Sequence, residues 1–215
     1  DGGFILTGFT APYGESHRDL WLIKTDSTGT ADWKVNYGGD LYDSGWDVEQ
    51  TGDGNYIVLG TTRSYGTGGT TDAWLLKVRE SHVYHVATTG SDSTGDGSEA
   101  NPFATIQHGI DVSSDGDTVL VAAGTYVENI HIFSKNIVVI GEDRETTIID
   151  GNQSGPVVHI ESGDGAMGET EIDSTSQFSG FTIQNGYGSW IGGIGCDGCM
   201  GATLSNLIIT ENTNT

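Results

Sequence analysis

Two apolar segments near the end of the sequence lie 26 residues apart, and this spacing constrains the fold more than any other feature. Residues 180–185 read GFTIQN, and residues 206–211 read NLIITE. Shorter apolar runs precede them, at residues 137–140, 147–149 and 157–160. Short runs that recur at the length of one coil are typical of a parallel β-helix, in which each strand stacks on the coil below. We therefore predict short parallel strands from about residue 117 onward.

The composition fits many tight turns between short strands. The chain has 34 glycines and only 3 prolines among its 215 residues. Glycine and asparagine adopt left-handed backbone conformations more readily than other residues. The turn residues that we expect in such conformations are Asn136, Gly151, Asn152, Asn185, Gly186 and Asn212.

A dense motif covers residues 83–132. Its parts, in order, are YHV (84–86), GSD (90–92), DGS (96–98), NPFATIQ (101–107), GDTV (116–119) and GTYVENI (124–130). This order resembles the module of unknown function that opens many right-handed, pectin-lyase-like β-helix proteins. The resemblance implies that residues 81–215 form the cap and the first coils of such a helix, with a short α-helix covering the open end of the coil.

This capping helix is expected over most of residues 102–112. Asn101 provides an N-cap, and Pro102 occupies the first helical position. Phe103, Ile106 and Ile110 fall at i, i+3 and i+7, which places them on one face of a helix.

A different repeat occupies the first third of the chain. Residues 1–8 (DGGFILTG) return as residues 53–60 (DGNYIVLG), and residues 19–24 (DLWLIK) return as residues 72–77 (DAWLLK). Between these segments, Tyr13-Gly14 returns as Tyr65-Gly66. One period contains four strand-like runs, at residues 4–10, 20–25, 33–37 and 46–51. Four short strands in a repeat of about fifty residues fit one blade of a β-propeller.

The repeat resembles the Gly/Trp-rich repeats of bacterial surface proteins. Because a propeller usually needs at least about four blades, we expect the sequence to be a fragment of a longer protein. The four tryptophans are expected to pack between blades, with sugar stacking as the alternative; they are Trp21, Trp33, Trp46 and Trp74. The predicted fold class is all-β, with partial β-propeller-like repeats (residues 1–80) followed by a right-handed parallel β-helix with a short capping helix (residues 81–215).

The charge of the chain argues against two kinds of partner. Thirty acidic residues against eight basic ones give a formal net charge of −22. Such a surface repels the phosphates of nucleic acids and anionic membranes. No stretch approaches the ~18–20 continuous apolar residues of a membrane span. We expect no nucleic-acid partner, no membrane insertion and a monomeric chain.

Cleavage of polysaccharides has weak support in the sequence. Residues 81–215 hold only two basic residues, Lys135 and Arg144, against eighteen acidic ones. A lyase needs a base and cations that neutralise a uronate substrate, and we interpret Arg144 as a turn residue paired with neighbouring carboxylates. An inverting glycosidase needs carboxylates paired across a cleft, and no spacing singles out such a pair. We therefore assign no catalytic residue in this chain.

Two pairs of residues are candidate ligands. Asp92 and Asp96 share a Gly/Ser-rich loop, where their oxygens are candidate calcium ligands; Asx-turns and capping explain them equally well. Cys196 and Cys199 have C-x₂-C spacing, but no second ligand pair for zinc stands near them. A small disulfide or two buried thiols are the remaining alternatives. Calcium is thus the one cofactor that we predict.

We interpret the sequence as a non-catalytic, modular extracellular or cell-surface protein. Its rigid β scaffold is expected to display loops for adhesion or for contact with a polysaccharide or cell-surface glycan. This interpretation rests on analogy with the two families. The alternatives are a carbohydrate-active β-helix enzyme, a polysaccharide lyase or glycosidase whose active coils lie beyond Thr215, and a structural stalk.

Overall fold

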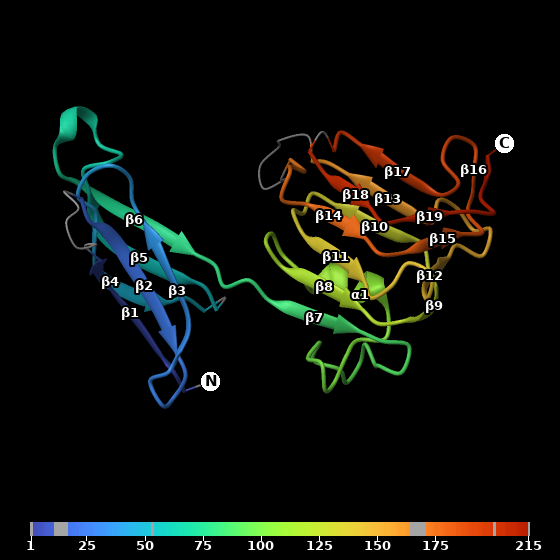
Figure 1. Cartoon of the computed structure of the whole chain (residues 1–215), viewed down its shortest axis with the longest axis horizontal. Coiled ribbons are helices and arrows are strands. Elements are labelled where there is room, and N and C mark those ends of the chain that lie inside the picture. The colour runs from blue at the N-terminus through green and yellow to red at the C-terminus, as the bar shows by residue number, and fades with distance from the viewer. Residues whose placement is uncertain (1, 11–16, 53, 164–170, 200, 215) are drawn as a thin grey trace. The chain divides into compact units, whose positions relative to one another are not determined.

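The computed structural model describes every residue except 1, 11–16, 53, 164–170, 200 and 215. Tyr13-Gly14 and Asp53, which belong to the sequence repeat, lie outside the described residues. The chain divides into two compact units, Asp1–Glu80 and Ser81–Thr215 (Figure 1). Strands dominate both units, so the protein is all-β.

The first unit consists of two antiparallel sheets of three strands each. The first sheet has the order β1 (Phe4–Thr10), β2 (Asp19–Thr25), β3 (Ala31–Tyr37), and the second has the order β4 (Ser44–Gln50), β5 (Tyr56–Thr62), β6 (Asp72–Val78). A 3-10 turn, η1 (Thr67–Gly69), lies between β5 and β6. The four strand-like runs of one period are therefore strands β1–β4, but β4 pairs with β5 and joins the second sheet.

The two sheets repeat the same strand pairing. Gly8 on β1 lies opposite Trp21 on β2, and Gly60 on β5 lies opposite Trp74 on β6. Leu20, Leu22, Tyr56, Val58 and Val78 form the buried core that the sheets share. Burial of these apolar side chains stabilises the unit by removing their surface from water.

The tryptophans of this unit differ in exposure. Trp33 and Trp74 pack against the core, and the ring of Trp33 lies edge-on to that of Tyr56 at 5.9 Å between centroids. Trp46 is instead 65% exposed, and its Nε1 donates to the Thr61 hydroxyl. Packing thus accounts for two of the four tryptophans, but not for Trp46.

The second unit is a right-handed parallel β-helix whose wall has three parallel sheets (Figure 1). The five-stranded sheet has the order β7 (Val83–Val86), β8 (Thr118–Val121), β11 (Val138–Gly141), β14 (Gln177–Ser179), β18 (Thr203–Ser205). The four-stranded sheet comprises β9 (Gly124–Val127), β12 (Thr147–Asp150), β15 (Thr182–Gln184) and β19 (Ile208–Ile209). The three-stranded sheet, hereafter the histidine sheet, comprises β10 (Ile130–Phe133), β13 (Val158–Glu161) and β17 (Ile194–Asp197). Short strands β16 (Tyr187–Gly188) and β20 (Thr213–Asn214) also pair in parallel.

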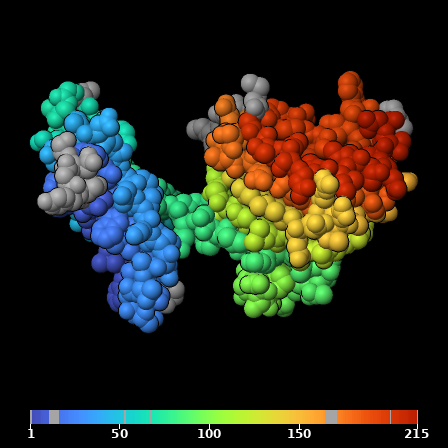
Figure 2. Space-filling model, in the orientation of Figure 1, coloured from blue at the N-terminus to red at the C-terminus, as the bar shows by residue number. Residues whose placement is uncertain are grey.

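The 26-residue spacing is the register of the last described coils. Thr182 on β15 lies opposite Ile208 on β19, and Ile183 lies opposite Ile209. Parallel strands from residue 118 onward confirm the prediction of stacked coils. Figure 2 shows the same order on the surface of this unit, where successive segments of the chain form successive bands.

Three ladders of inward side chains fill the coil. Val119, Val139 and Phe178 stack in register behind the five-stranded sheet. Tyr126, Ile149 and Ile183 do the same behind the four-stranded sheet, and Ile132 and Ile160 behind the histidine sheet. Each of these side chains is buried. Because every coil buries its apolar side chains against the next, the stack supplies the core.

The capping helix begins later than its sequence suggests. Helix α1 spans Ile106–Val112 with Thr105 as its N-cap, so the expected cap at Asn101 and start at Pro102 are wrong. Phe103 instead forms a bridge with Val86 at the end of β7, and this pairing holds the chain extended before the helix. The helix buries Ile106 and Ile110 over the first coil, as the apolar spacing indicates.

Some of the turn asparagines act through their side chains. Asn152 and Asn185 have the expected left-handed backbone, with φ of 48° and 56°. Asn136 and Asn212 are not among the residues with positive φ, and neither are Gly151 and Gly186. The Asn136 amide bonds to backbone groups at Glu171 and Asp173, and the Asn212 amide to those at Gly186 and Ile183. These amides tie one coil to the next because they satisfy backbone groups that the turns leave unpaired.

Candidate functional site on the outer wall of the coil

The outer face of the histidine sheet carries a row of polar side chains. In β10 and β13, isoleucine and valine point into the coil, and the alternate residues point outward. The register places His131 opposite His159 and Phe133 opposite Glu161. On the next coil, Glu161 lies opposite Asp197.

Each histidine on this face contacts a carboxylate of the following coil. His131 Nε2 lies 3.1 Å from Glu161 Oε2, and His159 Nε2 lies 2.9 Å from Asp197 Oδ2. The two imidazole rings stack with 5.2 Å between centroids and 9° between planes. All four side chains remain accessible, since their exposed fractions run from 31% to 66%. The face therefore offers ring nitrogens and carboxylate oxygens side by side.

A pocket adjoins the second of these pairs. It has a volume of about 300 Å³ and is lined by Pro156, His159, Gly188, Ser189, Trp190, Ile191 and Asp197. Trp190 is 89% exposed, the highest exposure of any large hydrophobic residue in the part of the chain that the structure describes. An aromatic ring beside hydrogen-bonding groups suits a ligand with both apolar and hydroxyl faces.

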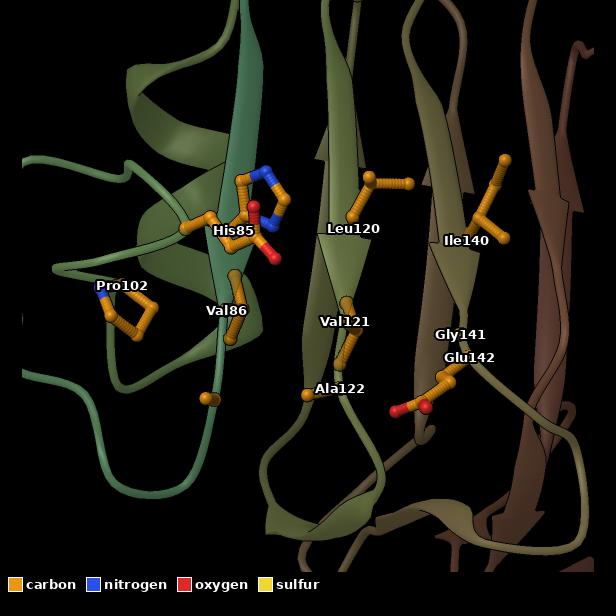
Figure 3. A pocket seen from close by; sticks show the side chains of 11 residues that line it. His85, Val86, Pro102, Leu120, Val121, Ala122, Ile140, Gly141 and Glu142 are labelled. Atoms are coloured by element: carbon orange, nitrogen blue, oxygen red, sulfur yellow. The ribbon is translucent and has the colours of Figure 1, made fainter.

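A larger hollow of about 410 Å³ lies on the outer face of the five-stranded sheet (Figure 3). Leu120 and Ile140 form its apolar floor on neighbouring strands, and His85 lies in register beside Leu120. Two carboxylates also line it, those of Glu99 and Glu142. Glu142 accepts a hydrogen bond from the Ala123 backbone N–H, which fixes its position at one end of the hollow.

The predicted calcium ligands hold different segments of the cap. The Asp92 carboxylate accepts hydrogen bonds from the backbone N–H groups of Ala104 and Thr105 and from the Thr105 hydroxyl. Burial raises the pKa of Asp92, but these hydrogen bonds outweigh burial and leave the pKa below its ordinary value. Asp96 instead accepts from the Ser98 N–H within its own turn, and hydrogen bonds from Ser98 lower its pKa. The calcium site stays a prediction.

Glu128 is a second carboxylate at the start of helix α1. Its two oxygens accept from the backbone N–H groups of Ile106 and Gln107, each at 3.0 Å. Burial raises its pKa more than these two bonds lower it, and the nearby Asp92 charge adds to the increase. Five successive backbone N–H groups, from residue 104 to residue 108, thus donate to side-chain oxygens of Asp92, Glu128 and Thr105.

Three other residues considered in the sequence have structural positions. Arg144 lies in an exposed turn, and its carbonyl accepts the Thr182 hydroxyl. Cys196 and Cys199 form a disulfide, with 5.8 Å between their Cα atoms, which decides between the two alternatives.

Sequence reasoning missed the histidine sheet and Trp190. The signal for β10 is the alternation in Ile-His-Ile-Phe at residues 130–133, and Val-His-Ile-Glu at 158–161 repeats it. Trp190 lies outside regular structure, where no periodic pattern marks it. His131 lies at the end of the motif at 83–132, whereas His159 and Trp190 lie outside it.

No helix among the described residues is long and apolar enough to cross a membrane.

The stacked parallel sheets, the filled interior and the helix over the first coil define a right-handed β-helix protein with an N-terminal cap. Residues 88–215 match the model of a family described as a protein of unknown function, DUF1565. The match covers more than half of the 215-residue chain, and the chain belongs to this family, which is associated with the pectin-lyase-like fold. No curated protein and no solved structure matches the chain.

Proposed function

We propose that this chain is a non-catalytic part of a modular extracellular or cell-surface protein, and that its β-helix contacts glycans through the pocket beside Trp190. The observation that carries the proposal is the exposure of Trp190 next to a hydrogen-bonded histidine and aspartate. An exposed indole beside hydrogen-bonding side chains offers a flat apolar surface next to polar groups. Its flat face packs against the C–H face of a sugar ring.

The polar lining of the pocket suits sugar hydroxyls. His159 Nε2 and Asp197 Oδ2 are 2.9 Å apart, so each side chain orients the other. Asp197 accepts hydrogen bonds, while the serine at 189 both donates and accepts. A volume of about 300 Å³ lies at the lower end of the range for small-molecule sites, which fits one or two sugar residues.

One feature supports an extracellular or cell-surface location, and another bears on the partners. The Cys196–Cys199 disulfide favours an oxidising compartment. The charge of −22 keeps the surface soluble and disfavours nucleic acids as partners.

We further propose that residues 1–80 are propeller-like repeats, supported by the equivalent Gly8–Trp21 and Gly60–Trp74 pairs. We propose a monomer for the chain.

The test is binding of neutral and acidic oligosaccharides to the wild-type chain and to Trp190→Ala. An array selects the sugars, and titration calorimetry measures their affinities. Loss of the stacking contact is expected to weaken binding by about 1–2 kcal/mol, or roughly 5- to 30-fold, by analogy with other aromatic contacts.

Trp46→Ala is the matched control because Trp46 is also exposed but lies in the first unit. It is expected to leave the affinity unchanged. Equal weakening by both substitutions, or an array with no bound sugar, would contradict the proposal.

The hollow in Figure 3 supports a second candidate, a carbohydrate-active enzyme. Glu99 and Glu142 both line this hollow, and a glycosidase needs two carboxylates beside one bond. Glu142 accepts a hydrogen bond, and His85 also lines the hollow; both are compatible with acid–base chemistry. We rank this candidate second because the Glu142 carboxylate already serves the Ala123 turn. A structural stalk, the third alternative, needs neither pocket.

A further inference from the structure

We propose that the outer face of the histidine sheet binds one divalent transition-metal ion of the zinc class, with His131, His159 and Glu161 as its protein ligands. The proposed site shares His159 with the lining of the glycan pocket, but it does not require that the pocket binds a sugar. The proposal rests on the in-register stacking of two histidines from successive coils beside Glu161, which lies on the same strand as His159.

The donor atoms already lie close together. One ligand atom from each of the three side chains lies within 4.8 Å of the others. His131 Nε2 and Glu161 Oε2 are 3.1 Å apart. Metal–ligand bonds of about 2.0–2.2 Å set neighbouring ligands of a tetrahedral zinc site roughly 3.3 Å apart. One edge of the site therefore has nearly the required length, and rotation of exposed side chains closes the others.

The types of ligand select the metal. Two imidazole nitrogens and one carboxylate oxygen suit zinc and related transition ions, whereas calcium and magnesium prefer oxygen ligands alone. The side chains of His131, His159 and Glu161 are 50%, 31% and 42% exposed. A fourth position is thus open to water, as in three-ligand zinc sites.

Asp197 acts as a positioning residue for this site. Its Oδ2 lies 2.9 Å from His159 Nε2, so it fixes the orientation of that ring. Metal-binding histidines commonly bond to a carboxylate through the nitrogen that does not hold the metal. In this arrangement His159 binds the ion through Nδ1.

The rings of His131 and His159 stack nearly in parallel, with 5.2 Å between centroids and 9° between planes. Because an imidazole binds a metal in the plane of its ring, one ring must rotate for both to bind the same ion, and the exposure of these side chains allows that rotation. Glu161 then offsets part of the charge of the ion.

The experiment is zinc titration of the full chain by calorimetry and by competition with a chromophoric chelator. We expect one zinc per chain, and we expect His131→Gln, His159→Gln and Glu161→Gln each to weaken zinc binding by at least about 10- to 100-fold. Glutamine keeps a polar side chain of similar length on the wall but lacks the ring nitrogen or the charge. Far-ultraviolet circular dichroism without zinc shows whether each variant keeps its fold.

His85→Gln and Trp190→Ala are the controls. His85 also points outward from a strand, but it lies on the five-stranded sheet, whereas Trp190 lines the glycan pocket without being a proposed ligand. Both variants are expected to bind zinc like the wild type. No saturable binding at millimolar zinc, or binding that survives both histidine substitutions, would overturn the proposal.

The role of Asp197 has its own readout. Asp197→Asn is expected to weaken zinc binding by about 10- to 100-fold, and Asp197→Glu to restore part of it. Nitrogen-detected NMR of the His159 ring reports which nitrogen holds the metal. Zinc on Nε2, with no effect of Asp197→Asn on affinity, would contradict the positioning role.

Discussion

At the scale of single residues, two carboxylates secure the cap of the coil. Asp92 and Glu128 come from segments on either side of helix α1 and bind backbone N–H groups at its start. The first N–H groups of any helix have no partner within the helix, so these carboxylates supply the missing acceptors. These bonds connect the GSD and GTYVENI segments of the motif with NPFATIQ.

Asp92→Ala is therefore expected to destabilise the second unit by about 1–3 kcal/mol, because two backbone N–H groups of the partly buried cap lose their acceptor. Thermal unfolding of the wild type and the variant measures the difference. Asp96→Ala serves as the comparison, since Asp96 bonds within its own exposed turn, and its effect is expected to be smaller. An Asp92→Ala chain as stable as the wild type would contradict the capping role.

Acidity affects the two capping carboxylates in opposite directions. The pKa of Asp92 is lowered below 3.8, so its contribution to stability is present above pH 3.8 and is lost as the pH falls through the lowered pKa. The pKa of Glu128 is raised above 4.5, so its contribution is present below pH 4.5 and is lost as the pH rises through the raised pKa. The difference in the free energy of unfolding between the wild type and Asp92→Asn should therefore decrease as the pH falls below 3.8.

The same variants test calcium binding at this loop. A ligand that binds only the folded state stabilises that state. If Asp92 and Asp96 hold calcium, millimolar calcium raises the melting temperature of the wild type, and the double substitution to alanine abolishes the rise. A melting curve that calcium leaves unchanged assigns both residues to turns and capping alone.

At the scale of elements, two coils approach each other closely at Gly141 and Gly180. Gly180, just after β14, has a φ of 84°, and a side chain there would overlap the carbonyl oxygen of Gly141. Gly116 has the same φ of 84° but has no heavy atom within 4 Å of the position of its missing Cβ. The two glycines thus separate the cost of a left-handed backbone from the cost of close packing.

We expect Gly116→Ala to destabilise the unit by about 1–2 kcal/mol, the cost of a left-handed alanine. Gly180→Ala adds overlap with the neighbouring coil, and its loss of stability should be larger by at least about 1 kcal/mol. Chemical denaturation of both variants measures the two costs. Equal losses would mean that the coils separate easily at this point.

At the scale of the whole molecule, the distribution of charge disfavours cleavage of acidic polysaccharides. Residues 81–215 carry two basic and eighteen acidic side chains. A uronate chain that approaches such a surface meets repulsion that salt screens only beyond about 8–10 Å. The hollow on the outer face of the five-stranded sheet is likewise lined by two carboxylates, those of Glu99 and Glu142.

We therefore expect the purified chain to leave pectate, alginate and a neutral glucan intact, with or without calcium. Ultraviolet absorbance follows the unsaturated ends that a lyase would make, and a reducing-end assay follows hydrolysis. Turnover that Glu142→Gln abolishes would make the glycosidase the better interpretation. Turnover that Arg144→Ala abolishes would favour a lyase instead.

Local patterns in the sequence predict much of this fold. The 26-residue spacing predicts the register of Thr182 with Ile208, because stacked coils of equal length bring equivalent residues together. Alternation in Ile-His-Ile-Phe determines that His131 points outward, since successive side chains of a strand lie on opposite faces. The motif at 83–132 likewise predicts a cap with a helix, although Phe103 delays its start.

Other features depend on contacts between distant segments, which no local pattern records. His131 meets His159 only because the intervening turns make that coil 28 residues long, whereas the next coil takes 36 residues to bring Ile194 opposite Val158. Strand β4 belongs to the first period of the sequence repeat, but it pairs with β5 and so lies in the second sheet. The sequence by itself determined which side chains face outward and that coils stack. Only the tertiary structure decided which outward side chains meet, because turn lengths set the register between coils and each turn is satisfied by contacts far along the chain.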